Sequence, residues 1–171
     1  MNRPQIQVAA GVGAGLVLGA GVGWVLWRHL GISPRPFDLA QRLAFALTWS
    51  LLPALCLVAG ILMVANQRFF AGAGDPLTAD DRMAEIWRRY VANTAEQALL
   101  FLIGAGAFSV VAPQAELKAV PIAAALFVLG RMLFAGGYLI RPSLRAAGFT
   151  LTFAPVALLC LLAALIAWFR F

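Results

Sequence analysis

The chain has 171 residues, of which 63% are hydrophobic and 12% are charged, and its mean hydropathy is +0.88. Ordinary soluble domains carry about 25% charged residues, so this composition excludes them and predicts a polytopic, all-α membrane protein. The net charge of +6 does not indicate nucleic-acid binding. Most arginines flank hydrophobic runs, as lipid-headgroup anchors do, and no basic face with interleaved aromatic residues is present.

Five hydrophobic stretches are each close to the roughly 20 residues that a helix needs to cross the hydrocarbon core of a bilayer. We therefore expect five membrane spans. They cover approximately residues 6–27, 43–65, 90–112, 119–140 and 149–169.

The first span places a glycine at every fourth position. Such spacing leaves a groove along one helix face and favours close helix packing, although glycine is also frequent in membrane helices in general. The stretch ends in WVLWRHL without a small-x-small cleavage pattern, so we interpret it as a span and not as a signal peptide. The partner of this face, within the chain or in another protein, is left open. The glycines are Gly11, Gly15, Gly19 and Gly23.

The third span carries Arg89, Asn93 and Glu96 at the i, i+4, i+7 spacing that predicts one polar helix face. A carboxylate inside a membrane helix costs about 2.5 to 3.5 kcal/mol, so it requires a partner. Arg131 is the only basic residue deep inside another hydrophobic stretch. The sequence thus predicts an ion pair between Glu96 and Arg131, which is either structural or part of a ligand site.

The fourth span repeats this pattern, because Arg131, Phe134, Tyr138 and Arg145 share a face if the helix continues past Pro142. With five alternating spans, the start of the third and the end of the fourth lie on the same side of the membrane. We expect the arginines of both to converge there, and a concentration of guanidinium groups suits an anionic ligand. The fifth span is apolar and is expected to contribute no chemistry.

Basic residues outside the spans number seven on the side of the N-terminus and five on the opposite side. The positive-inside rule therefore favours a cytoplasmic N-terminus.

No metal site is expected. Asp80 and Asp81 stand where a helix begins and suit the helix dipole, and His29 has no second ligand at metal-binding spacing. Cys56 and Cys160 lie in apolar segments and are interpreted as buried small hydrophobic residues.

Two short patterns resemble those of the MAPEG family, the membrane-associated proteins in eicosanoid and glutathione metabolism, which includes the microsomal glutathione transferases. The first is R-x-x-x-N-x-x-E at Arg89, Asn93 and Glu96. The second is R-x-x-F-x-x-G-Y, from Arg131 to Tyr138, with Arg145 seven residues beyond the tyrosine. The similarity covers about residues 43–171, and residues 1–42 form an additional N-terminal span and interfacial loop.

The resemblance implies a four-helix membrane domain that assembles as a homotrimer, with glutathione bound between subunits near the cytoplasmic face. Arg145 would lie beside the thiol as the catalytic residue. A lipophilic small molecule would arrive through the bilayer as the second substrate. The positions implied to bind glutathione are Arg89, Asn93, Glu96, Tyr138 and Arg131, with Arg68 as a looser match.

Two positions depart from the pattern, because Gln97 and Phe134 stand where glutathione-using members often have tyrosine. The leading hypothesis is a membrane glutathione transferase or peroxidase in which an arginine stabilises the thiolate. The alternative is a non-catalytic, lipid-binding or accessory subunit in which the polar cluster only holds helices together.

Overall fold

A computed structural model describes residues 3–70, 82–140 and 142–170 of the chain. Within these residues there are five long α-helices and one short 3-10 helix, and no strand is present. They are α1 (Arg3–His29), α2 (Leu39–Phe70), α3 (Arg82–Val111), η1 (Gln114–Lys118), α4 (Ala119–Leu139) and α5 (Pro142–Trp168).

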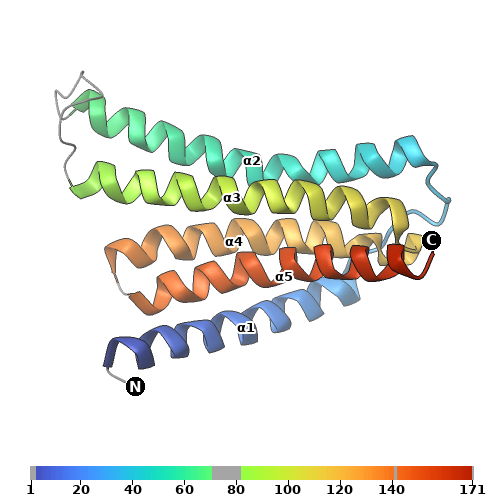
Figure 1. Cartoon of the computed structure of the whole chain (residues 1–171), viewed down its shortest axis with the longest axis horizontal. Coiled ribbons are helices and arrows are strands. Elements are labelled where there is room, and N and C mark those ends of the chain that lie inside the picture. Colours follow the sequence, from blue (N-terminus) through green and yellow to red (C-terminus); the bar gives the residue numbers. More distant parts are fainter. Residues whose placement is uncertain (1–2, 71–81, 141, 171) are drawn as a thin grey trace.

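The five helices run up and down alongside one another, with the N-terminus at one end of the bundle and the C-terminus at the other (Figure 1). All five are long and apolar enough to cross a membrane. The all-helical class and the five spans predicted from composition are therefore confirmed. The start of α3, the end of α4 and the start of α5 lie at the same end of the bundle.

The core lies between α2, α3, α4 and α5. Phe101 and Phe127 are fully buried, and their rings meet edge to face with centroids 6.1 Å apart. Helix α4 is the most enclosed, since 56% of its most hydrophobic window is buried, against 11% for α1 and α2. Large apolar side chains cover the outside of the bundle, as expected for a surface in contact with lipid.

Helix α1 packs along α5 through its glycine face. A methyl group on Gly15 would lie 2.6 Å from the carbonyl oxygen of Ala147, and one on Gly11 would collide with the backbone of Ser143. The predicted packing face is therefore present. Its partner over these two turns is α5 of the same chain, so this part of the face is not open to another protein.

Helix α4 does not continue into α5, which corrects the expectation of one helix face from Arg131 to Arg145. Helix α4 ends at Leu139 and α5 begins at Pro142, and Gly137 lies directly against the backbone of Arg145. Only a residue without a side chain fits at this distance. Arg145 therefore lies against the last turn of α4. Asp80 and Asp81 lie outside the described residues.

Candidate functional site

A buried arginine lies at the centre of the bundle. Only 1% of the Arg131 surface is exposed, and its guanidinium donates hydrogen bonds to side chains of both α3 and α5. Buried polar groups are strongly destabilising unless they are hydrogen-bonded, and here four neutral oxygens serve as acceptors. These are Oδ1 of Asn93 (2.8 Å), Oγ1 of Thr94 (3.4 Å), Oε1 of Gln97 (3.3 Å) and Oγ1 of Thr152 (2.5 Å). We call these five residues the Arg131 network.

The predicted ion pair between Glu96 and Arg131 is absent. None of the carboxylates of the described residues lies within ion-pair distance of Arg131, and Glu96 is on the exposed surface of α3. The helix geometry explains this. At about 100° per residue, Gln97 lies roughly 40° beyond Asn93 on the side facing α4, whereas Glu96 lies roughly 60° away on the other side. Asn93 faces inward, so Glu96 faces outward.

Aromatic rings continue the site from Arg131 toward the end of the bundle. The guanidinium carbon of Arg131 lies 4.6 Å from the ring centre of Phe134, and Phe134 meets the ring of Tyr138 edge to face at 5.3 Å. The guanidinium carbon of Arg145 lies 5.2 Å from the Tyr138 ring centre. Cation–π contacts of this kind stabilise a cation beside an aromatic face. Tyr138 therefore joins the buried arginine to an exposed one.

The outer face of α3 carries its own charges. Nε of Arg89 donates to Glu85 at 2.7 Å, and Arg88 pairs with the same carboxylate at 3.3 Å. The Arg89 side chain is 65% exposed, so this pair contributes little to stability. Arg89 is thus held by Glu85 near the start of α3, at the same end of the bundle as the contact between Arg145 and Tyr138.

The structure brings the predicted site residues together in part. Asn93 and Arg131 are hydrogen-bonded, Tyr138 and Arg145 are in contact, and Arg89 lies near the start of α3, at the same end of the bundle as that contact. Glu96 is exposed on the same side of α3 as Arg89 and away from Arg131. Arg68 lies in the last turn of α2, at the same end of the bundle (Figure 1).

Sequence reasoning missed Thr94, Gln97 and Thr152 as partners of Arg131, and Glu85 as the partner of Arg89. The expectation that the fifth span contributes no chemistry is wrong, because Thr152 in α5 accepts a hydrogen bond from Arg131. Gln97 could have been predicted as a partner of Arg131, because it follows Asn93 by one helical turn and shares its face. Thr152 gives no such signal, because an isolated threonine is ordinary in a membrane helix.

A pocket of about 230 Å³ lies beside Arg145. Its walls are apolar apart from the arginine, and they include two valines of α1, so the N-terminal helix helps to enclose it. The lining residues are Val8, Val12, Phe134, Arg145, Ala146 and Phe149.

The cysteines and potential metal ligands form no further site in the described part of the chain. Cys56 and Cys160 are not joined in a disulfide. Among the described residues, no group of three or more His, Cys, Asp or Glu side chains is close enough to hold a metal ion.

An all-helical bundle whose five helices can cross the membrane, with polar residues buried inside it, defines a multi-pass integral membrane protein. The family model of the MAPEG family matches residues 45–165, so the chain belongs to this family. The match includes α3, α4 and the Arg131 network, whereas α1 lies outside it.

Two curated relatives carry the name Transmembrane protein 79. The protein of Bos taurus is 28% identical over 155 residues, which cover 90% of this chain and 39% of the relative. The protein of Mus musculus is 27% identical over 124 residues, which cover 72% of this chain and 32% of the relative. This chain therefore spans only 32% to 39% of the length of these relatives, and their name states no catalytic activity.

Proposed function

We propose that this chain is a membrane glutathione transferase or peroxidase that works as a homotrimer on lipophilic electrophiles. The observation that carries the proposal is the exposed carboxylate of Glu96. It lies six residues inside the expected third span (residues 90–112), or roughly 9 Å from the entry of that span at 1.5 Å per residue. A bare carboxylate at this depth would face the hydrocarbon core of the bilayer, at a cost of about 2.5 to 3.5 kcal/mol or more.

A neighbouring subunit is the simplest cover for Glu96. Arg89 precedes it by seven residues and lies on the same outer face of α3, where it pairs with Glu85. An interface with a neighbouring subunit over this face would therefore enclose Arg89 and two carboxylates. Glutathione carries two carboxylates and one ammonium group. Arg89 suits a carboxylate through paired guanidinium hydrogen bonds, and Glu96 suits the ammonium group. In this proposal Arg131 and Asn93 do not contact glutathione. They hold α3 in place from inside the subunit and so stabilise the interface between subunits.

Arg145 is the proposed catalytic residue. A free thiol has a pKa of about 8.5 and is mostly protonated at neutral pH, and a neighbouring cation increases the thiolate fraction. The thiolate sulfur would form a bond to the electrophilic carbon while the leaving group departs with its electron pair. The apolar pocket beside Arg145 suits the lipophilic partner in this step. With the N-terminus in the cytoplasm, the arginines would receive glutathione from the cell interior.

Substitution of Arg145 tests the catalytic role. Arg145→Ala should lower the rate of glutathione conjugation to a lipophilic aryl halide at least tenfold. Arg145→Lys, which keeps the positive charge, should retain a measurable part of the rate. Full activity in Arg145→Ala, with an unchanged oligomer, would remove this residue from the mechanism.

A second candidate function has its own support. Within the described residues, all four hydrogen-bond acceptors of Arg131 are neutral and belong to the same chain, which is what a purely structural role requires. Gln97 accepts a hydrogen bond from Arg131, and the ring of Phe134 packs against the same guanidinium. A non-catalytic, lipid-binding or accessory subunit would need no more than this. It would leave glutathione unbound at millimolar concentration, whereas the enzyme would bind it.

A further inference from the structure

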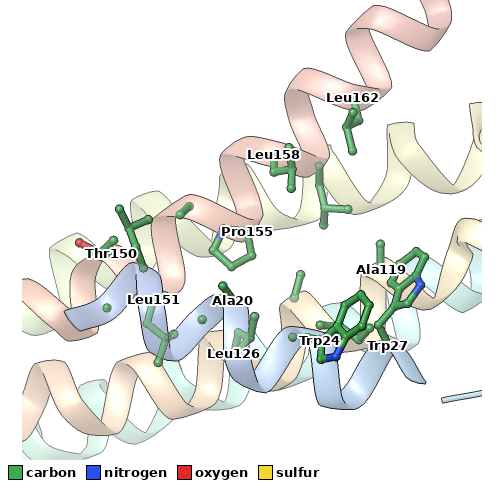
Figure 2. A pocket seen from close by; sticks show the side chains of 18 residues that line it. Ala20, Trp24, Trp27, Ala119, Leu126, Thr150, Leu151, Pro155, Leu158 and Leu162 are labelled. Atoms are coloured by element: carbon green, nitrogen blue, oxygen red, sulfur yellow. The ribbon is translucent and has the colours of Figure 1, made fainter. Parts of the chain in front are cut away.

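An apolar groove of about 440 Å³ runs between α1 and the pair α4 and α5 (Figure 2). This volume is within the range of about 300 to 1,000 Å³ that is usual for small-molecule sites. The glycine face of α1 forms its floor from Gly15 onward, and Ile122, Leu126, Leu151 and Pro155 form the opposite wall. The lining has almost no polar surface, with Thr150 as its polar side chain.

The groove opens toward the lipid and has the length of one leaflet. Trp24 is 62% exposed and Leu158 is 54% exposed, although both line the groove. From Gly15 to Trp27 the α1 helix advances by about 18 Å at 1.5 Å per residue. Half of a hydrocarbon core of about 30 Å is about 15 Å. The groove therefore matches one acyl chain that lies parallel to the helices.

Two cations stand at one end of this groove, beside tryptophans that line it. Nζ of Lys118 lies 4.1 Å from the ring centre of Trp27 and donates to the Trp27 carbonyl oxygen at 3.2 Å. The guanidinium carbon of Arg28 lies 5.8 Å from the Trp24 ring. Tryptophan with lysine or arginine at a helix end is typical of the headgroup region.

We propose that this groove binds one acyl chain of an anionic phospholipid, whose phosphate lies at Lys118 and Arg28. The apolar length fits the chain, and the charge at the mouth fits the headgroup. The site is separate from the proposed glutathione site, because the arginines near Tyr138 lie at the opposite end of the bundle (Figure 1). It depends on α1, which lies outside the part of the chain matched by the family model.

Filling the groove tests the position of the lipid. Ala20 lines the groove on α1, whereas Ala14 is an exposed residue of the same helix that does not line it. Each full-length variant is reconstituted with equimolar phosphatidylglycerol and phosphatidylcholine, and the retained lipids are counted by native mass spectrometry. Ala20→Phe should lose the retained lipid, and Ala14→Phe should keep it. Equal retention in both variants, or no lipid retained by the wild type, would overturn the proposal.

Removing the charge at the mouth tests the headgroup preference. Wild type should prefer phosphatidylglycerol, and Lys118→Gln should lower that preference about fivefold, the effect of one basic residue near an anionic surface. Lys118→Arg keeps the charge and should keep the preference. This control shows that the effect of Lys118→Gln comes from the lost charge and not from a loss of folding. An unchanged preference in Lys118→Gln would refute the headgroup assignment. A change in the oligomer on Ala20→Phe with an unchanged lipid count would show that a second copy occupies the groove, and would refute the proposal.

Discussion

Nη2 of Arg131 donates a hydrogen bond of 2.5 Å to Oγ1 of Thr152, and this bond ties α4 to α5 at the centre of the bundle. The same guanidinium reaches Asn93 on α3. One side chain thus joins three helices. Because its acceptors are neutral, the positive charge stays inside the subunit without a carboxylate among the described residues to balance it.

Loss of the buried arginine should destabilise the bundle. Arg131→Met removes the shared donor of four hydrogen bonds and leaves Oε1 of Gln97 without its donor, which costs about 1 to 3 kcal/mol for an unsatisfied group. The hydroxyls of Thr94 and Thr152 still donate to carbonyl oxygens of their own helices. Thermal unfolding in detergent should show a Tm several degrees lower than that of the wild type. Arg145→Met, at an exposed position, is the control and should leave Tm nearly unchanged. Equal Tm values for the two variants would contradict the central place of the Arg131 network.

A matched pair of threonines in α5 isolates the bond to Thr152. Thr152→Val removes an acceptor from Arg131 and should lower the free energy of unfolding by about 1 to 3 kcal/mol. Thr150→Val changes a hydroxyl that donates to the Ala146 carbonyl oxygen of its own helix, so its effect should be smaller. The comparison is made by denaturant unfolding of both variants. A larger effect at Thr150 would show that Thr152 contributes little.

The contact between α1 and α5 depends on glycine at particular positions. A side chain at Gly15 would meet the backbone of Ala147, whereas one at Gly13 would meet nothing within 4 Å. Gly15→Leu should therefore destabilise the protein by about 1 to 3 kcal/mol, as overpacking does, and Gly13→Leu should not. Tm values of the two variants measure this difference. If both are equally stable, α1 does not pack on α5 through this face.

Much of the fold follows from the sequence, because length and hydropathy define five spans and the glycine period identifies a packing face. The need of Arg131 for buried partners was also predictable. The identity of those partners was not. Asn93 and Glu96 are only about 60° apart on a helix, so a small rotation decides which faces α4, and that rotation is set by packing between helices. The contact of Arg145 with Tyr138 depends on how closely α5 packs against α4 at Gly137.

The exposed carboxylate of α3 should matter for ligand binding. Glu96→Gln removes the proposed partner of the glutathione ammonium group and should raise the Kd for glutathione at least tenfold, the weight of a charged hydrogen bond of about 1.5 kcal/mol or more. Glu85→Gln removes a carboxylate that pairs with Arg88 and Arg89 at the surface and should change the Kd less. Equal binding by wild type and Glu96→Gln would rule out that contact.

The most direct measurement is a calorimetric titration of the reconstituted wild-type protein with glutathione, repeated with the double variant Arg89→Ala and Arg145→Ala. The account predicts saturable binding at or below millimolar concentration for the wild type and none for the double variant. Absence of binding by the wild type, or equal binding by both proteins, would contradict the claim that these arginines gather to receive an anionic thiol.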